Sequence, residues 1–183
     1  MKHVIVRTSL AVGFAVMTAT LASAQTTVAL TDESQSTTLT AEVSEQARIT
    51  VPAGVAFNVG NTSVITNAAV ASVTVDNIAL ATATKQLEIS VAANALAFTA
   101  SGAGATWASS DVTWGVATFS NAGVGSAGAL AGIGAYGVVA TCAADVAECS
   151  TTNLVFSLAA KPAVKNAGAH TLAITWKFAS IGA

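Results

Sequence analysis

Cys142 and Cys149 are the residues of this 183-residue sequence whose type and spacing most clearly indicate covalent chemistry. The six residues between them are more than the two of the C-x-x-C motif that is typical of redox-active pairs. A metal site would need further cysteines or histidines close by, and the surrounding sequence T-C-A-A-D-V-A-E-C has none. We therefore expect a structural disulfide that closes a short loop.

Candidates for catalysis are few. His170 is the only histidine apart from His3. We expect it in a solvent-facing turn, without the nucleophile and acid that a Ser-His-Asp site requires. The G-x-S-x-G motif is absent, and no two carboxylates are marked as the pair that a glycosidase needs. The sequence therefore predicts no enzyme, no catalytic residue and no cofactor.

Two other features leave alternatives open. Asp145 and Glu148, inside the cysteine loop, could bind calcium together with backbone carbonyls, but hydrated surface carboxylates explain them equally well. We expect no metal there. Trp107, in G-A-T-W-A-S-S-D, lies outside the strong alternation of its neighbours, and if exposed it could stack on a sugar ring. The alternative function is thus a monomeric extracellular module that binds a glycan or another ligand.

The first 24 residues predict export. Lys2, His3 and Arg7 precede an uncharged, mostly apolar run from Ser9 to Leu21, and Ala22-Ser23-Ala24 offers a cleavage site before Gln25. This is the pattern of a secretory signal peptide, removed from the mature chain. No later segment is long and apolar enough for an integral membrane helix. We expect a protein that crosses the periplasm and remains secreted or at the cell surface.

Composition limits the partners. Only 9% of the residues are charged, and removal of Lys2 and Arg7 leaves five basic residues against nine acidic ones. We expect no nucleic-acid partner, because phosphate binding depends on clustered Lys and Arg. Few charges also leave little repulsion between copies of the chain. We expect it to bind itself or other surface proteins.

Alternating apolar residues predict an all-β fold. Apolar and polar residues alternate from Thr38 to Val51, and Leu172, Ile174, Trp176 and Phe178 form one apolar face of the last strand, which we expect in the core. Further runs of this kind are separated by Gly, Asn, Ser and Pro clusters, at the spacing of an antiparallel, Ig-like Greek-key β-sandwich. We assign this domain to residues 37–183.

Two segments predict contacts between copies. Residues 25–36 contain a short apolar strand with Val28 and Leu30, followed by a polar stretch. This extension is either an ordinary first strand or a donor strand that completes a neighbour's sheet. The Gly/Ala-rich stretch Val124–Gly134 is expected to be a flexible loop, or an edge that lets another backbone approach closely.

Residues 37–179 resemble small exported β-sandwich proteins of bacterial surfaces, namely fimbrial subunits and spore-coat-U-type proteins. The resemblance rests on the export signal, the early strand T-L-T-A-E-V-S-E-Q-A-R-I-T-V, the close cysteine pair and the final strand H-T-L-A-I-T-W-K-F. It implies an incomplete Ig-like sandwich, which a neighbour's strand completes in a surface polymer. The late, close cysteines differ from the chaperone–usher pattern, and no functional residues are carried over. The function expected is that of a structural or adhesive subunit.

Overall fold

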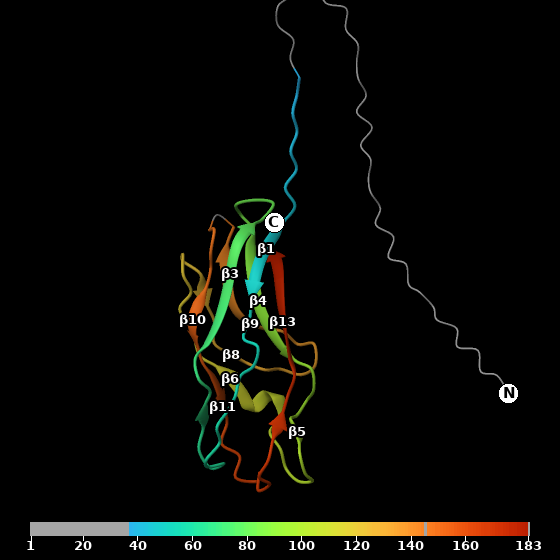
Figure 1. Ribbon diagram of the computed structural model, residues 1–183, viewed down its shortest axis with the longest axis vertical. Coiled ribbons are helices and arrows are strands. Elements are labelled where there is room, and N and C mark those ends of the chain that lie inside the picture. Colours follow the sequence, from blue (N-terminus) through green and yellow to red (C-terminus); the bar gives the residue numbers. More distant parts are fainter. Residues whose placement is uncertain (1–36, 145, 183) are drawn as a thin grey trace, which may run out of the picture. The chain divides into compact units, whose positions relative to one another are not determined.

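The computed structural model describes residues 37–144 and 146–182. The chain divides into two units, residues 1–40 and 41–183, and all the strands of the described residues belong to the second (Figure 1). Three predicted features lie outside the described residues: the signal peptide at 1–24, the extension at 25–36 with Val28 and Leu30, and Asp145.

The described residues form antiparallel β-sheets, which confirms the predicted all-β class. Apart from strands they contain one turn of 3₁₀ helix, η1 (Ser109–Asp111). The strands are β1 (Gln46–Thr50), β2 (Thr66–Asn67), β3 (Ala71–Ala79), β4 (Gln86–Ala93), β5 (Thr99–Ala100), β6 (Val112–Trp114), β7 (Val124–Gly125), β8 (Gly128–Ala129), β9 (Gly137–Ala143), β10 (Thr151–Leu154), β11 (Phe156–Leu158), β12 (His170–Thr171) and β13 (Ile174–Ile181).

One layer is built around β3, which pairs with β1 on one side and β10 on the other. After β10 the chain continues as β11, which pairs with β2 and β6, and β6 pairs with β8. The other layer has the order β13-β4-β9-β7. In it β13 pairs with β4 over eight residues, from Ile174 opposite Ala93 to Ile181 opposite Gln86. A further short pair is formed by β12, which precedes β13 in the chain, and β5, which follows β4.

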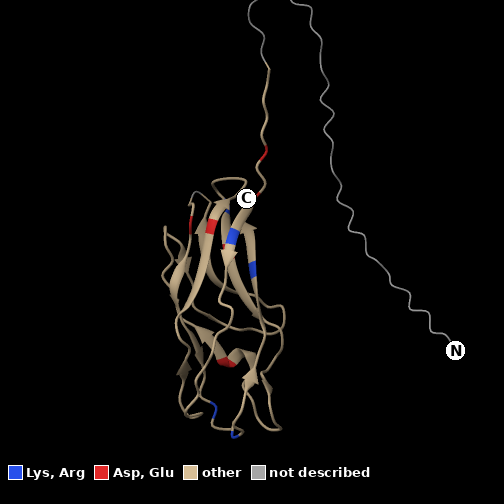
Figure 2. Cartoon of the chain, viewed as in Figure 1, with Lys and Arg blue, Asp and Glu red and all other residues tan. Residues whose placement is uncertain are grey.

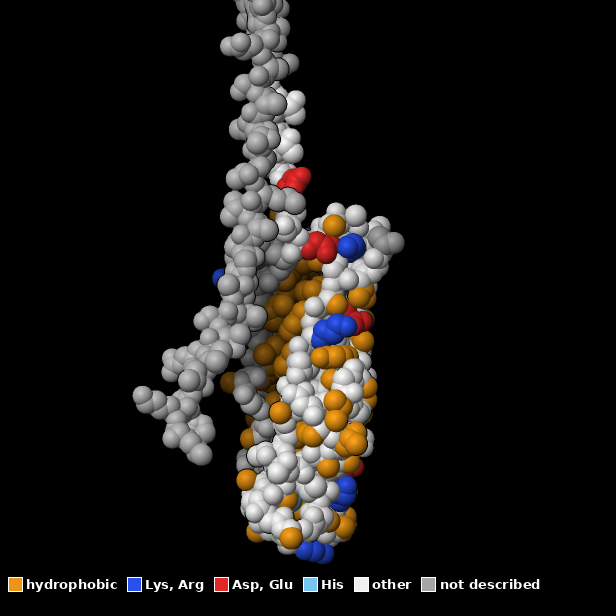
Figure 3. Space-filling model, turned by 90° about the vertical axis from the view of Figure 1, so that its right-hand side faces the viewer, with side chains coloured by type: hydrophobic (Ala, Val, Ile, Leu, Met, Phe, Trp, Pro, Cys, Tyr) orange, Lys and Arg blue, Asp and Glu red, His pale blue; other side chains and the backbone are white. Residues whose placement is uncertain are grey.

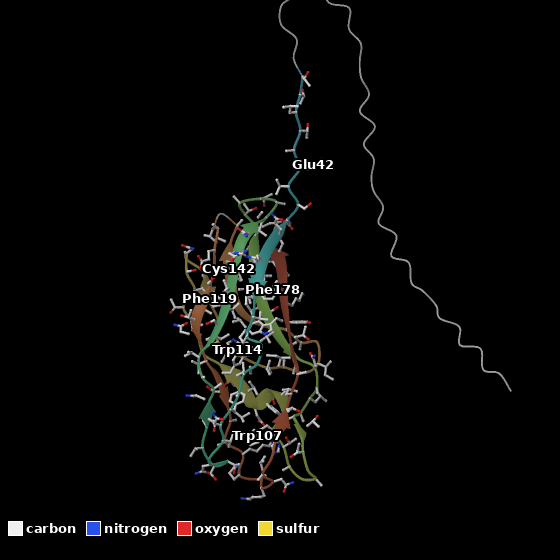
Figure 4. All side chains as sticks on the ribbon, in the orientation of Figure 1. Glu42, Trp107, Trp114, Phe119, Cys142 and Phe178 are labelled. Atoms are coloured by element: carbon white, nitrogen blue, oxygen red, sulfur yellow. A yellow bond between two sulfur atoms is a disulfide. The ribbon has the colours of Figure 1, made fainter. Side chains whose placement is uncertain are left out.

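The core lies between these layers. On β3 every second residue is buried (Ala71, Val73 and Val75), as expected for a strand with one face on a core. Aromatic rings bridge the layers: Phe156 on β11 packs edge-to-face against Trp114 on β6 and Trp176 on β13, with centroids 6.0 and 6.4 Å away. Figure 4 labels Trp114 within the sandwich.

The predicted disulfide is confirmed: Cys142 and Cys149 are bonded, and both are completely buried. Cys142 belongs to β9, whereas Cys149 lies just before β10. Because β9 and β10 belong to different layers, the bond ties the two layers together.

The chain itself closes one side of the sandwich. β7 belongs to the layer of β9 and β8 to the layer of β6, and only two residues separate β7 from β8. A Cβ atom at Gly125 would overlap the carbonyl oxygen of Ala117, and one at Gly128 would lie 2.5 Å from the Trp114 ring. The close backbone approach predicted for Val124–Gly134 therefore takes place within this chain.

The opposite side has less strand than the sequence predicts. The alternation from Thr38 to Val51 predicts one long strand, or two joined at a bend near Glu45, but β1 covers only Gln46–Thr50. Residues 37–45 pair with no strand of the described part of the chain. Residues 51–59, which include Pro52, pair with none either. An alternating pattern forms a strand only where another backbone lies beside it, and the sequence does not show where that is so.

Candidate functional site

A long apolar groove runs along the side where β1 and β13 lie. Its volume is about 1190 Å³. One wall is the segment 51–62 that follows β1, and the other is the stretch 164–176 that leads into β13. Figure 3 views the molecule from this side, where hydrophobic side chains gather in a recess.

One wall of the groove is a strand edge, that of β13, whereas the segment 51–62 of the other wall follows β1 and forms no strand. β1 pairs with β3 alone and β13 with β4 alone, so among the described residues no strand covers the outer edge of either. The amide of Asn94 donates to the carbonyl of Ala173 at 2.9 Å, which fixes the side of the chain that faces β4. Because these groups alternate in direction along a strand, the N–H and C=O groups of Ile174 and Trp176 point to the open edge.

The walls consist of apolar residues that are only half buried. Leu172, Ile174 and Trp176 line the groove at alternate positions and pack against the core from its open side. The sequence predicts that these three residues and Phe178 belong to the core. The prediction is confirmed in part, because all four pack against the core but are only partly buried. Each is covered less fully than Ile89 or Val91 on the neighbouring β4, which are completely buried. The opposite wall repeats this pattern with Val55, Phe57 and Val59.

Trp107 lies inside the molecule, where it lines the groove but is only 4% exposed. Its indole N–H donates to the carbonyl of Ala159 at 2.9 Å, and its ring packs edge-to-face against Phe98 and His170. Figure 4 labels it at the end of the sandwich near β5. In this position it offers no free ring face on which a sugar could stack.

His170 connects two loops. Its Nδ1 lies 2.8 Å from the Thr106 hydroxyl, and its Nε2 lies 3.3 Å from the carbonyl oxygen of Asn166. The side chain is half buried, not solvent-facing as the sequence suggests. Both ring nitrogens thus have partners, and neither partner is a carboxylate or a serine. This arrangement is structural rather than that of a general base.

Charged groups are sparse and lie mainly away from the groove (Figure 2). Lys165 is the only Lys, Arg, Asp or Glu among its described lining residues. Ion pairs join Arg48 to Asp76, Lys85 to Glu45 and Lys161 to Asp111. The described residues hold no group of three or more His, Cys, Asp or Glu side chains able to bind a metal ion. The calcium hypothesis itself depends on Asp145, which lies outside them.

Glu45 marks the entrance to β1. Its Oε1 accepts hydrogen bonds from the Ala81 amide at 2.8 Å and the Ser180 hydroxyl at 3.2 Å, and Lys85 lies 3.0 Å away. The Ala81 amide, followed by Lys85, holds the pKa of this carboxyl below its usual value. Ser180 is on β13, so Glu45 joins the two edges at one end of the open side.

The sequence predicts the residues of the groove but not the groove. Leu172, Ile174 and Trp176 stand out by their alternation, yet alternation looks the same on a strand covered on both edges and on one covered on a single edge. The signal that the sequence offers is an alternation of apolar and polar residues at both 38–51 and 171–178. It indicates an opening only once the pairing order shows both segments at the outside of their sheets.

The described residues contain no helix that is both long and apolar enough to cross a membrane. Family models, curated proteins and solved structures were compared with this chain, and none of them matches it.

Proposed function

We propose that this protein is a secreted structural subunit of a bacterial cell-surface or extracellular fibre. Each copy would accept a strand from a neighbouring copy in the groove beside β13. The single observation that carries this proposal is that groove, lined mainly by apolar residues and bordered on one wall by the uncovered edge of β13.

Strand addition would satisfy both features of the groove at once. Uncovered edges carry free backbone donors and acceptors, and soluble proteins normally protect them with charges, prolines or bulges. An added strand pairs with these groups, while its inward side chains cover the half-buried Leu172, Ile174 and Trp176. Covering apolar area contributes about 25 cal/mol per Å², so a strand that fills the groove binds through its side chains as well as its backbone.

Export is part of the proposal and has two supports. The first 24 residues have the pattern of a signal peptide, and the Cys142–Cys149 disulfide fits an oxidising compartment. We place the mature chain in the periplasm in transit and then at the cell surface or outside the cell, bound to further copies or to other surface proteins.

The groove favours assembly over turnover or glycan binding. A hydrolytic site needs a positioned acid, base or nucleophile, and Lys165 is the one charged side chain among the described lining residues. The glycan-binding alternative depended on an exposed Trp107, whose N–H is already bonded to Ala159. An Ig-like Greek-key arrangement, with the neighbour's strand as its last member, is the architecture that we propose for the assembled subunit.

Electron microscopy and light scattering of the exported chain test this function. We expect the wild type to form regular filaments. Ile174→Lys, which places a charge in the groove, should abolish them while circular dichroism still shows a folded β-protein. Thr175→Lys, on the opposite face of the same strand and exposed, is the matched control and should assemble. Leu172→Lys repeats the test if Ile174→Lys does not fold.

A wild-type chain that stays monomeric at high concentration would refute the proposal. So would filaments formed equally well by both groove variants. A folded monomer that binds an immobilised glycan in a screen would support the alternative function instead.

A further inference from the structure

We infer that the strand inserted into the groove is the segment 38–43 of a second copy, with Leu39, Ala41 and Val43 facing the core. This inference rests on the proposed function and names its partner segment. It differs from the expectation that Val28 and Leu30 make these contacts.

The first support is the unsatisfied pattern of this segment. Leu39, Ala41 and Val43 alternate with Thr38, Thr40 and Glu42, as in a strand with one apolar face. Leu39 is 92% exposed and Val43 78%, which makes them the most exposed large hydrophobic residues of the described chain. Residues 37–45 have no strand partner there. The segment thus has the side chains of a half-buried strand and no sheet to bury them in.

The second support is the match with the groove wall. Leu172, Ile174 and Trp176 repeat at the same two-residue interval as Leu39, Ala41 and Val43. Alternate residues of any strand lie about 6.6 to 6.8 Å apart, so three apolar positions on the incoming strand can lie beside three on the wall, with both sets pointing toward the core. The backbone groups of Ile174 and Trp176 that point to the open edge can then pair with the incoming strand.

The connection of only two residues between this segment and β1 favours a second copy over the chain's own groove. To return beside β1, residues 38–43 would have to reverse direction at Ser44 and Glu45. Two-residue hairpin turns require positive φ angles. Among described residues other than glycine, positive φ occurs only at Asn77, Asn121 and Ala122. Glu45 is also held in place by Ala81 and Lys85.

The test compares two double variants in the exported full chain. We expect Leu39→Asp/Val43→Asp to remain monomeric, because charges on the apolar face oppose burial in the groove. This variant should be folded as stably as the monomeric Ile174→Lys or Leu172→Lys variant. Any difference between their free energies of unfolding should be no larger than the destabilisation that the lysine in the groove causes. Thr40→Asp, on the opposite face of the segment, is the matched control and should assemble, as should Val28→Asp/Leu30→Asp.

The outcomes separate this inference from the proposed function. If Val28→Asp/Leu30→Asp blocks assembly and Leu39→Asp/Val43→Asp does not, the donor is residues 26–36 and the inference is wrong, although the proposed function stands. Assembly of both double variants would also overturn the inference. A wild-type chain that forms no filaments would overturn the proposed function itself.

A peptide supplies a second readout on the monomeric variant. Of the three tryptophans, Trp107 and Trp114 are at most 4% exposed, whereas Trp176 is half buried in the groove wall. Adding a peptide of residues 36–45, S-T-T-L-T-A-E-V-S-E, should therefore shift tryptophan emission to the blue as Trp176 is covered. The same peptide with aspartate in place of Leu39 and Val43 should produce no shift. A shift with both peptides, or with neither, would contradict the inference.

Discussion

Glu45 fixes the point where the chain enters the sandwich. One carboxylate oxygen receives hydrogen bonds from Ala81 and Ser180, and it also lies beside the ammonium group of Lys85. These partners come from the loop after β3, from β13 and from the residue just before β4, so a single side chain holds three parts of the fold in register at this end. We expect the position of β1 relative to β13 to depend on its charge.

The acid stability of the monomer should therefore depend on Glu45. Its pKa is lowered in the folded chain from the ordinary value of 4.5, chiefly by the Ala81 amide. The contribution of Glu45 to stability is complete above that ordinary pKa, and it is lost as the pH falls through the lower, folded value. Glu45→Gln should lower stability at neutral pH and flatten its dependence on pH below about 4.5.

Urea unfolding of a non-assembling variant at a series of pH values checks this. Glu42→Gln, three residues earlier and exposed, is the control and should leave the pH profile unchanged. Identical profiles for Glu45→Gln and its parent would show that the hydrogen bonds to Glu45 contribute nothing measurable.

The three tryptophans show how far single residues can be predicted. The alternation around Trp114 and Trp176 correctly places both on strands facing the core. It does not show that Trp114 is completely enclosed while Trp176 is half open, because that depends on which strand ends up outermost. Trp107 has no alternating neighbours, so its burial follows from loop packing and from its bond to Ala159, which sequence pattern does not reveal.

At the level of elements, the crossing from β7 to β8 depends on glycine. Gly125 lies against the carbonyl of Ala117, and Gly128 and Gly137 both lie against the ring of Trp114. Side chains at these positions would push the crossing away from the core. The two layers stay closed on this side because these positions carry no Cβ atom.

We expect Gly125→Ala to destabilise the fold, by about 1–3 kcal/mol as is typical of overpacking. The reason is that the new methyl group overlaps backbone, which cannot rotate away as a side chain can. Gly54→Ala is the matched control, because a Cβ atom there has nothing within 4 Å. Thermal or urea unfolding of both variants measures the difference. Equal stability would mean that the crossing has more space than its geometry indicates.

Elements with a partner inside the chain are predicted well. The alternation over 72–80, 85–91 and 136–142 marks β3, β4 and β9 to within a few residues, and the cysteine spacing marks the disulfide. Residues 38–45 and 55–59 show the same alternation and form no strand. Local sequence reports the preference for an extended chain, whereas a strand also needs a backbone beside it, and that is settled by tertiary structure.

At the level of the whole molecule, the two sides of the sandwich differ. The β7–β8 crossing closes one side, and the other leaves the groove and two strand edges uncovered. The core of the folded chain is therefore covered less fully on this side. Its half-buried residues include Ile174 and Trp176 on one wall and Phe57 on the other. Completing that core should be visible as a gain in stability.

We expect assembled protein to unfold at a higher temperature than the Leu39→Asp/Val43→Asp monomer, because a partner that binds only the folded state stabilises it. The increase should depend on protein concentration for the wild type and not for the variant. Calorimetry at several concentrations measures this, with the assembly-competent Thr40→Asp as the control. Unfolding temperatures that are equal in filaments and monomers would show that the inserted strand adds nothing to the core.

The closure of one side by the β7–β8 crossing also limits how many neighbours each copy can have through strand exchange. In the proposed assembly, the recess and the donor segment would give each subunit two such connections, one as acceptor and one as donor. The contact would be head-to-tail, so a row of subunits would have a direction and two chemically different ends. One end would present an unfilled recess and the other an unused segment. Growth could then be stopped at either end by a different kind of molecule: a free strand at the first, an empty sandwich at the second.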